Sequence, residues 1–111
     1  MDKVEFNSVR QAVYDVVRTI PYGRATSYGA IAKAIGYPNY SRLVGRIMAN
    51  CNSAIPAHRV VNSQGTLSAK GAFGDGDEMK NLLEAEGIAV QHDKIKNWKK
   101  VFWNPLEEIN L

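Results

Sequence analysis

The apolar residues of this chain recur at helical spacing in short runs that glycine and proline interrupt, which favours a fold of short packed helices. The first run predicts a helix over residues 7–19, ended by Pro21 and Gly23. The second starts after Ser27, whose hydroxyl can cap a helix, and continues to Gly36. The stripe of the first predicted helix consists of Val9, Ala12, Val13, Val16 and Ile20.

A third predicted helix follows so closely that it forms a helix-turn-helix with the second. Residues 36–38 make the turn, and Asn39 is the predicted N-cap. The apolar side of this helix is formed by Tyr40, Leu43, Val44, Ile47 and Met48. The opposite side is formed by Arg42, Gly45, Arg46 and Ala49.

That opposite side is basic and low in profile, as a DNA recognition helix requires. Small residues let the helix backbone approach a duplex closely, while arginines engage phosphates or enter a groove. An ordinary solvent-exposed helix face is the alternative. The distribution of charge favours the first interpretation, because residues 16–74 contain seven lysines and arginines and no carboxylate. A polyanion is the natural partner of such a segment.

The length of 111 residues predicts one domain over residues 1–111, with one core and no separate cofactor domain. No apolar run reaches the roughly 18 residues of a membrane span, and residues 1–6 lack a secretory signal. The single cysteine, Cys51, excludes an internal disulfide and fits a reducing cytoplasm. The chain has only two histidines, His58 and His92, besides this cysteine, so we expect no metal site and no cofactor. A monomer is the simplest assumption.

The second half of the chain predicts less regular structure. Residues 59–67 are typical of a short hairpin, residues 68–76 of a flexible glycine-rich loop, and residues 77–86 of a helix stopped by Gly87. The fold class is therefore mainly α with a short β-hairpin. We assign the aromatic cluster of the tail to packing: Trp98, Val101, Phe102 and Trp103.

Glu86 lies on the apolar side of the helix over residues 77–86, seven positions after Met79. A buried carboxylate needs specific hydrogen-bond partners, because desolvating an unpaired charge costs several kcal/mol. A frayed last turn that exposes Glu86 is the alternative.

Residues 55–61, Ile-Pro-Ala-His-Arg-Val-Val, resemble the active-site signature of the O6-alkylguanine-DNA alkyltransferases, whose Pro-Cys-His-Arg run holds the cysteine that accepts the alkyl group. Ala57 stands at the position of that cysteine. The likeness extends to the segments 26–29, 41–45, 62–65 and 82–87. It implies the winged-helix-like, helix-turn-helix domain of the alkyltransferase C-terminal type.

The resemblance implies that Tyr28 presses on the phosphate of an extruded nucleotide and that Arg42 fills the space the guanine leaves. Flipping costs a few kcal/mol, which an intercalated guanidinium partly offsets. The helix would lie in the minor groove. The implied DNA-binding residues are Tyr28, Ser41, Arg42, Gly45 and Arg46. The implied lesion pocket consists of Tyr28, Pro56, Ala57, His58 and Arg59.

In the alkyltransferases the signature histidine activates the cysteine through a water and is oriented by a glutamate. His58 and Glu86 match those positions. Without a thiol at Ala57 the pair has nothing to activate, so we expect it to be retained as a structural hydrogen-bond pair and the protein not to be an enzyme. Cys51 lies six residues earlier without an adjacent histidine and is not expected to replace the nucleophile.

Loss of the nucleophile with retention of the flipping residues resembles the alkyltransferase-like proteins, which bind O6-alkylguanine and mark it for nucleotide excision repair. Many of them have tryptophan where this chain has Ala57, so the pocket should be roomier here. The residues leave open which adducts are preferred, which repair protein docks, and whether Asn50 or Asn52 contacts the base. The glycine-containing loop after Leu67 is expected to supply another pocket wall.

Two other functions stay open at this point. A sequence-specific regulator would use the same helix-turn-helix in the major groove. The exposed face, with Arg42 and Arg46 beside Gly45 and Ala49, offers few side chains that could read base edges in detail. A dealkylating enzyme would remove the alkyl group by another route, for example with His58 activating water.

Overall fold

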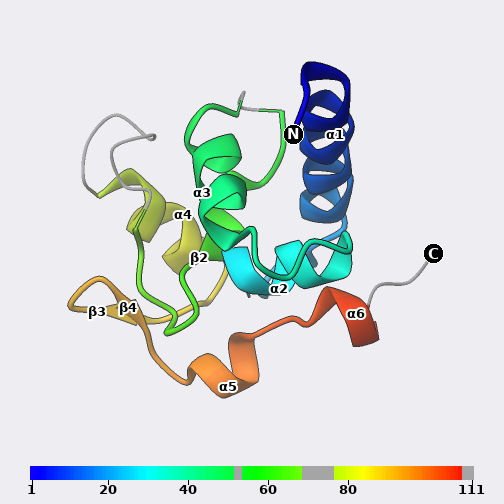
Figure 1. Cartoon of the computed structure of the whole chain (residues 1–111). Coiled ribbons are helices and arrows are strands. Elements are labelled where there is room, and N and C mark those ends of the chain that lie inside the picture. Colours follow the sequence, from blue (N-terminus) through cyan, green and yellow to red (C-terminus); the bar gives the residue numbers. More distant parts are fainter. Residues whose placement is uncertain (52–53, 69–76, 109–111) are drawn as a thin grey trace.

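The computed structural model describes residues 1–51, 54–68 and 77–108, which are mainly helical (Figure 1). The elements of the first half are α1 (Lys3–Arg18), β1 (Thr26–Ser27), α2 (Tyr28–Ala34), α3 (Ser41–Ala49), the 3-10 turn η1 (Ala57–Arg59) and β2 (Val60–Val61). The elements of the second half are α4 (Glu78–Ala85), β3 (Val90–Gln91), β4 (Lys94–Ile95), α5 (Trp98–Val101) and α6 (Pro105–Glu108). Among the described helices, none combines the length and apolarity needed to cross a lipid bilayer.

The first helix is present but begins earlier than predicted, at Lys3 instead of Asn7. The cause is Asp2, whose carboxylate accepts a hydrogen bond from the Glu5 N–H at 2.8 Å and so caps the helix. The predicted stripe also needs correction, since Ala12 and Val16 are only partly buried. The fully buried line along α1 consists of Val9, Val13 and Val17.

The predicted helix-turn-helix is confirmed, with α2 and α3 packed against each other. Ser27 caps α2 as expected, because its hydroxyl accepts a hydrogen bond from the Ala30 N–H at 3.1 Å. After α2 the chain turns at Gly36, which has a φ of +88° that glycine adopts without strain. The turn is closed by the N–H of Tyr37, which donates to the carbonyl of Ala32 at 2.9 Å.

The predicted cap of α3 is wrong. The N-cap residue is Tyr40 and not Asn39, because the carbonyl of Tyr40 accepts the first helical hydrogen bond, from the Val44 N–H at 3.0 Å. No side chain caps this end. The amide groups at the start of α3 therefore stay available to solvent or a ligand.

The predicted hairpin over residues 59–67 is also wrong. Val60–Val61 pair instead with Thr26–Ser27, in parallel, so β2 joins β1 from far along the chain. A turn does follow, in which the Gly65 N–H donates to the Asn62 carbonyl at 3.0 Å, but Thr66 then bridges to Lys94. The hairpin of the structure is β3 with β4.

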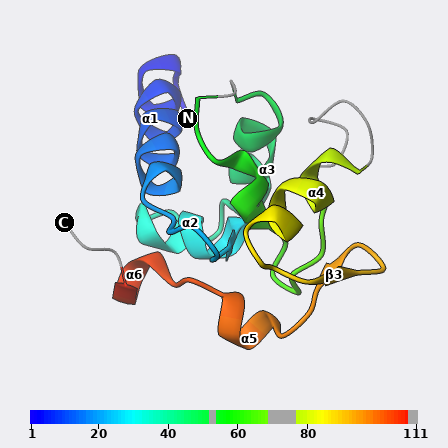
Figure 2. The same cartoon turned by 180° about the vertical axis from the view of Figure 1, so that it is seen from behind.

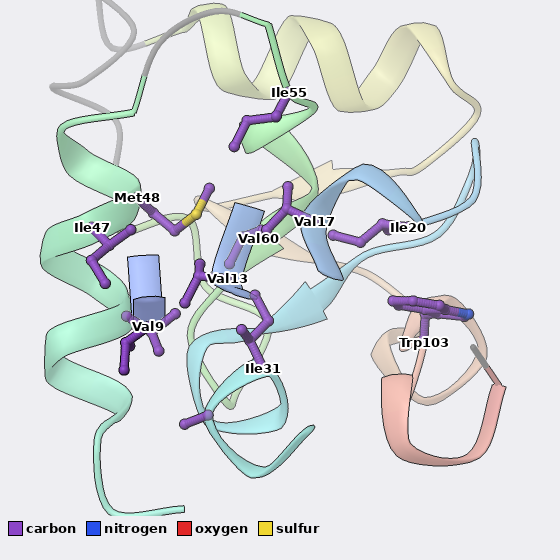
Figure 3. Packing of buried hydrophobic residues seen from close by; sticks show 12 residues of the cluster. Val9, Val13, Val17, Ile20, Ile31, Ile47, Met48, Ile55, Val60 and Trp103 are labelled. Carbon is purple, nitrogen blue, oxygen red and sulfur yellow. The ribbon is translucent and has the colours of Figure 1, made fainter. Parts of the chain in front are cut away.

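The core consists of two clusters that meet at β2. Val60 belongs to the first cluster and its neighbour Val61 to the second, because successive side chains of a strand point to opposite faces. Figure 3 shows Ile47 and Met48 at one end of the first cluster and Trp103 near its other end. The second cluster is built around Leu83 of α4. Residues 57–59 directly precede β2, so both clusters hold them in place.

The C-terminal tail runs back across α2, and α6 lies beside that helix in Figures 1 and 2. Trp103 is 2% exposed, which confirms that the aromatic cluster of the tail serves packing. The N–H of Trp103 donates to the Ala25 carbonyl at 2.7 Å, and the guanidinium of Arg24 donates to the Val101 and Phe102 carbonyls. These bonds fasten the tail next to the start of β1.

Candidate nucleic-acid interface

The basic side of α3 faces outward, as the helical spacing predicted. Arg42, Arg46 and Ala49 are exposed and Gly45 is half-buried, while Val44 on the other side of the helix is fully buried. Neither arginine has an ion-pair partner within the described ranges. Two guanidinium groups without carboxylates are therefore displayed on a helix whose small residues leave its backbone accessible.

A hollow of about 600 Å³ lies along this side of α3. Besides α3, its walls come from the start of α2 and from the segment after β2. Its described lining residues are Tyr28, Gly29, Ser41, Arg42, Gly45, Arg46, Ala49, Asn62, Ser63 and Ser68. The five residues to which the resemblance assigned DNA binding thus line one hollow. Sequence reasoning did not single out Gly29, Asn62 and Ser63, although the segments 26–29 and 62–65 carried part of the likeness. Ser68 begins the loop after Leu67 that was expected to supply a wall.

Tyr28 is the first residue of α2 and is held from across the hollow. The hydroxyl of Ser68 donates a hydrogen bond to the Tyr28 hydroxyl at 3.1 Å. This bond leaves the Tyr28 O–H free to donate in turn to an acceptor such as a phosphate oxygen. The Tyr28 hydroxyl is thus linked to Ser68 in the lining of the hollow.

The signature residues lie in a separate place, around η1. Ala57 is the first residue of this turn, which the Arg59 N–H closes by donating to the Pro56 carbonyl at 3.0 Å. The side chain of Ala57 packs partly buried against the first core cluster. The described lining of the hollow along α3 does not include residues 56–59, so the lesion pocket that joins them to Tyr28 stays a prediction.

Glu86 is buried and fully partnered, which excludes the alternative of a frayed, exposed last turn. Its side chain is 6% exposed, and its carboxylate lies 2.5 Å from Nε2 of His58. The same carboxylate accepts hydrogen bonds from Arg59 at 2.9 and 3.0 Å and from the Gly23 N–H at 2.8 Å. The predicted hydrogen-bond pair of His58 and Glu86 is confirmed, and it belongs to a larger network.

The charge of Glu86 is stabilised by this network. Burial alone would raise the pKa of the carboxyl group, but the hydrogen bonds from Arg59, His58 and Gly23 outweigh it and lower that pKa from 4.5 to about 2. An ionised carboxylate only accepts hydrogen bonds, so Nε2 of His58 must carry a proton. In neutral His58 the lone pair therefore lies on Nδ1, on the side of the ring away from Glu86.

Arg59 serves this network as well. Besides its bonds to Glu86, its guanidinium donates to the Ile20 carbonyl at 2.9 Å and lies 5.8 Å from the ring centre of Tyr22. Arg59 thereby joins the turn after α1 to the end of α4. Sequence reasoning missed Tyr22 and Gly23, whose only visible signal was the turn predicted at Pro21 and Gly23.

Cys51 is partly buried against the first core cluster. Burial raises the pKa of its thiol, which disfavours the reactive thiolate. The structure thus agrees with an idle thiol at this position. Within the described ranges, no three histidine, cysteine or carboxylate side chains gather as a metal site would require.

Asn52 and residues 69–76, most of the loop that was expected to supply a pocket wall, lie outside the described residues. Asn50 is described, and its side-chain amide donates to the Arg46 carbonyl at 2.9 Å at the end of α3.

Comparisons with known proteins agree with this geometry. Residues 8–88 match the family model of the 6-O-methylguanine DNA methyltransferase, DNA binding domain. Alkyltransferase-like protein 1 of Schizosaccharomyces pombe is 36% identical over 99 residues, which cover 84% of this chain and 92% of that protein. The DNA base-flipping protein of Vibrio parahaemolyticus is 43% identical over 95 residues, which cover 84% of this chain and 93% of that protein.

A solved structure of S. pombe Atl1 in complex with damaged DNA containing O6-carboxymethylguanine is similar over 95% of this chain and 100% of that chain, with a TM-score of 0.78 and 38% identity. The predicted fold class, a mainly helical domain of the alkyltransferase C-terminal type, is therefore confirmed. The chain belongs to the family of the 6-O-methylguanine DNA methyltransferase DNA-binding domain, and within it to the alkyltransferase-like, base-flipping proteins.

Proposed function

We propose that this protein binds O6-alkylguanine in duplex DNA by flipping the damaged nucleotide, and that it leaves the alkyl group in place. The observation that carries the proposal is the hollow beside the small-residue face of α3, whose lining brings Tyr28 and Arg42 together with Gly45 and Ala49. The S. pombe relative, in complex with damaged DNA containing O6-carboxymethylguanine, supports the choice of ligand.

Binding in this proposal begins with the phosphates. Arg42 and Arg46 are exposed and lack carboxylate partners in the described ranges, so they can replace counterions on the DNA backbone. Gly45 and Ala49 keep the surface of α3 low, which lets the helix enter the minor groove. This part of the affinity does not depend on the base.

Selectivity comes from flipping. Extruding a nucleotide costs a few kcal/mol, and less where a damaged base pairs poorly, so the lesion is selected partly by its weaker pairing. Arg42 fills the vacated space and donates hydrogen bonds to the orphaned cytosine. Tyr28, held by Ser68 at the edge of the hollow, contacts the phosphate of the extruded nucleotide.

The absence of a nucleophile supports binding without repair. The methyl group of Ala57 cannot accept an alkyl group. Burial raises the pKa of the Cys51 thiol, and Nε2 of His58 is held by Glu86. We therefore propose that His58 and Glu86 keep the shape of the turn at residues 57–59 and carry out no chemistry.

A complex that holds the lesion without turnover has a consequence for repair. The protein stays bound to the bent DNA for a long time and shields the base from an alkyltransferase. We propose that nucleotide excision repair proteins detect this complex.

The proposal is tested by fluorescence anisotropy with duplexes that differ only in one O6-methylguanine, using wild-type protein, Arg42→Ala and Tyr28→Phe. Arg42→Ala should weaken lesion binding by about 1 to 3 kcal/mol, because it removes a specific arginine contact. Arg18→Ala is the matched control, since Arg18 pairs with Asp15 at the end of α1 and should be dispensable. Equal affinity of wild type for damaged and plain duplexes would instead support a sequence-specific regulator and overturn the proposal.

A further inference from the structure

A second hollow, of about 400 Å³, adjoins the first. The two share Gly29 and Ser63 in their linings, so they meet at the start of α2 and the loop after β2. The second hollow runs on between α2 and the C-terminal tail. Its described lining residues are Ser27, Gly29, Ala30, Lys33, Ser63, Trp98, Phe102, Asn104 and Leu106.

Three hydrogen-bond donors line this hollow without a partner in the described ranges. Lys33 is exposed near the end of α2, and its ammonium group has no ion pair there. The hydroxyl of Ser63 is likewise unbonded within those ranges. The side chain of Asn104 accepts a hydrogen bond from the Leu106 N–H at 3.2 Å through its oxygen, which leaves its NH₂ group to donate elsewhere.

The charge of this hollow is positive. Its described lining includes Lys33 and no carboxylate. Outside this lining, Glu108 accepts a hydrogen bond from the Asn104 N–H at 2.8 Å. Its carboxylate is paired with Arg24 at 3.2 Å, so its charge is already offset. An anion in the hollow would therefore meet one unpaired ammonium group and two neutral donors.

The rest of the wall is apolar and aromatic. The rings of Trp98 and Phe102 lie 5.3 Å apart, and the indole N–H of Trp98 donates to the Ser63 carbonyl at 3.2 Å, which fixes the ring against the loop. One ammonium group, two neutral donors and an aromatic wall suit a phosphate with its attached sugar. Because the two hollows share Gly29 and Ser63, a duplex bound along the first could extend its backbone into the second.

We propose that this second hollow, through Lys33, Asn104 and Ser63, binds the phosphodiester backbone of the DNA beyond the flipped nucleotide. The inference rests on the proposed function, because it extends the same duplex from Tyr28 across Gly29 onto the C-terminal tail. It assigns the tail a role in DNA binding besides its packing. This contact reads the backbone only, so it adds affinity without adding preference for the lesion.

The test is the salt dependence of DNA binding by wild type, Lys33→Ala and Lys33→Arg, measured with damaged and plain duplexes. Loss of one phosphate contact lowers the slope of log affinity against log salt by about 1. The defect of Lys33→Ala should therefore be roughly three- to fourfold larger at 50 mM than at 200 mM salt, and the same for both duplexes. Lys33→Arg should keep the wild-type slope. Lys80→Ala is the matched control, because Lys80 lies on α4 and lines neither hollow.

A second variant tests the tail itself. Asn104→Asp keeps the oxygen that accepts the Leu106 N–H but replaces the free donor by a negative charge, so it should weaken both duplexes without unfolding α6. Methylphosphonate substitution of single phosphates should then reveal one flanking position where wild type loses affinity and Lys33→Ala does not.

The outcomes separate the two proposals. If Lys33→Ala binds with the same affinity and the same salt slope as wild type, and wild type prefers the damaged duplex, this inference alone is overturned. Absence of lesion preference in wild type would overturn the proposed function, whatever the slope of Lys33→Ala.

Discussion

Glu86→Gln is the substitution that tests the site network most sharply. Glutamine keeps the shape of the side chain but removes the charge that Arg59, His58 and the Gly23 N–H stabilise. The drop of the Glu86 pKa from 4.5 to about 2 corresponds to about 3 kcal/mol of stability, at about 1.4 kcal/mol per pH unit. We expect Glu86→Gln to lose about that much free energy of unfolding at pH 7, because it also leaves Arg59 with less compensation for its burial.

The pH dependence has a definite sign. The pKa of Glu86 is lower in the folded than in the unfolded protein, so its contribution is complete above about 4.5 and is lost as the pH falls toward 2. The difference in stability between wild type and Glu86→Gln should therefore be largest at pH 6 to 7 and shrink steadily below pH 4.5.

Urea unfolding followed by tryptophan fluorescence, at several pH values between 3 and 7, measures this difference. Glu84→Gln is the matched control, because Glu84 is an exposed carboxylate on the same helix and should show no such pH-dependent gap. A gap between wild type and Glu86→Gln that is under about 1 kcal/mol at pH 7, or that does not change with pH, would refute the reasoning.

Two further substitutions test the fold by thermal or urea unfolding. Gly65→Ala should destabilise the protein by about 1 to 3 kcal/mol, because Gly65 has a φ of +82° and an added Cβ would lie 2.9 Å from the Trp98 ring. Gly45→Ala, where an added Cβ meets nothing within 4 Å, should be neutral or stabilising; equal effects at the two glycines would contradict this account. Ser27→Ala should cost about 1 kcal/mol by removing the cap of α2, and a stability unchanged from wild type would argue against that cap.

The helices could be predicted from the sequence because their signals are local. Helical spacing located α1 to α4, and the hydroxyl of Ser27 marked the start of α2. The strands could not be predicted in the same way. Val60–Val61 pair with residues more than thirty positions earlier, and no local pattern encodes that pairing. The hairpin turn at His92 and Asp93 has positive φ at both residues without a glycine, so it lacked the usual turn signal.

Part of the candidate site could be predicted because a charged residue occupies a position in an apolar helical pattern. Glu86 stood on an apolar face, which indicated either a carboxylate with specific partners or a frayed last turn, and the structure supplies the partners. The contribution of Gly23 could not be foreseen, since it is a backbone N–H whose position depends on the packing of α4 against the turn after α1. The second hollow depends on the path of the tail across α2, which is set by the bonds of Arg24 and Ala25 to residues about 77 positions later.

The most direct test of the proposed function is a competition between equal amounts of damaged and plain duplex for a limiting amount of the protein, followed by base analysis of the DNA recovered from the complex. Recognition without repair predicts that the bound DNA is enriched in O6-methylguanine and that the methyl group is intact after prolonged incubation. The proposal would be contradicted if the bound DNA contained the two duplexes in their starting ratio, or if it contained guanine in place of the modified base.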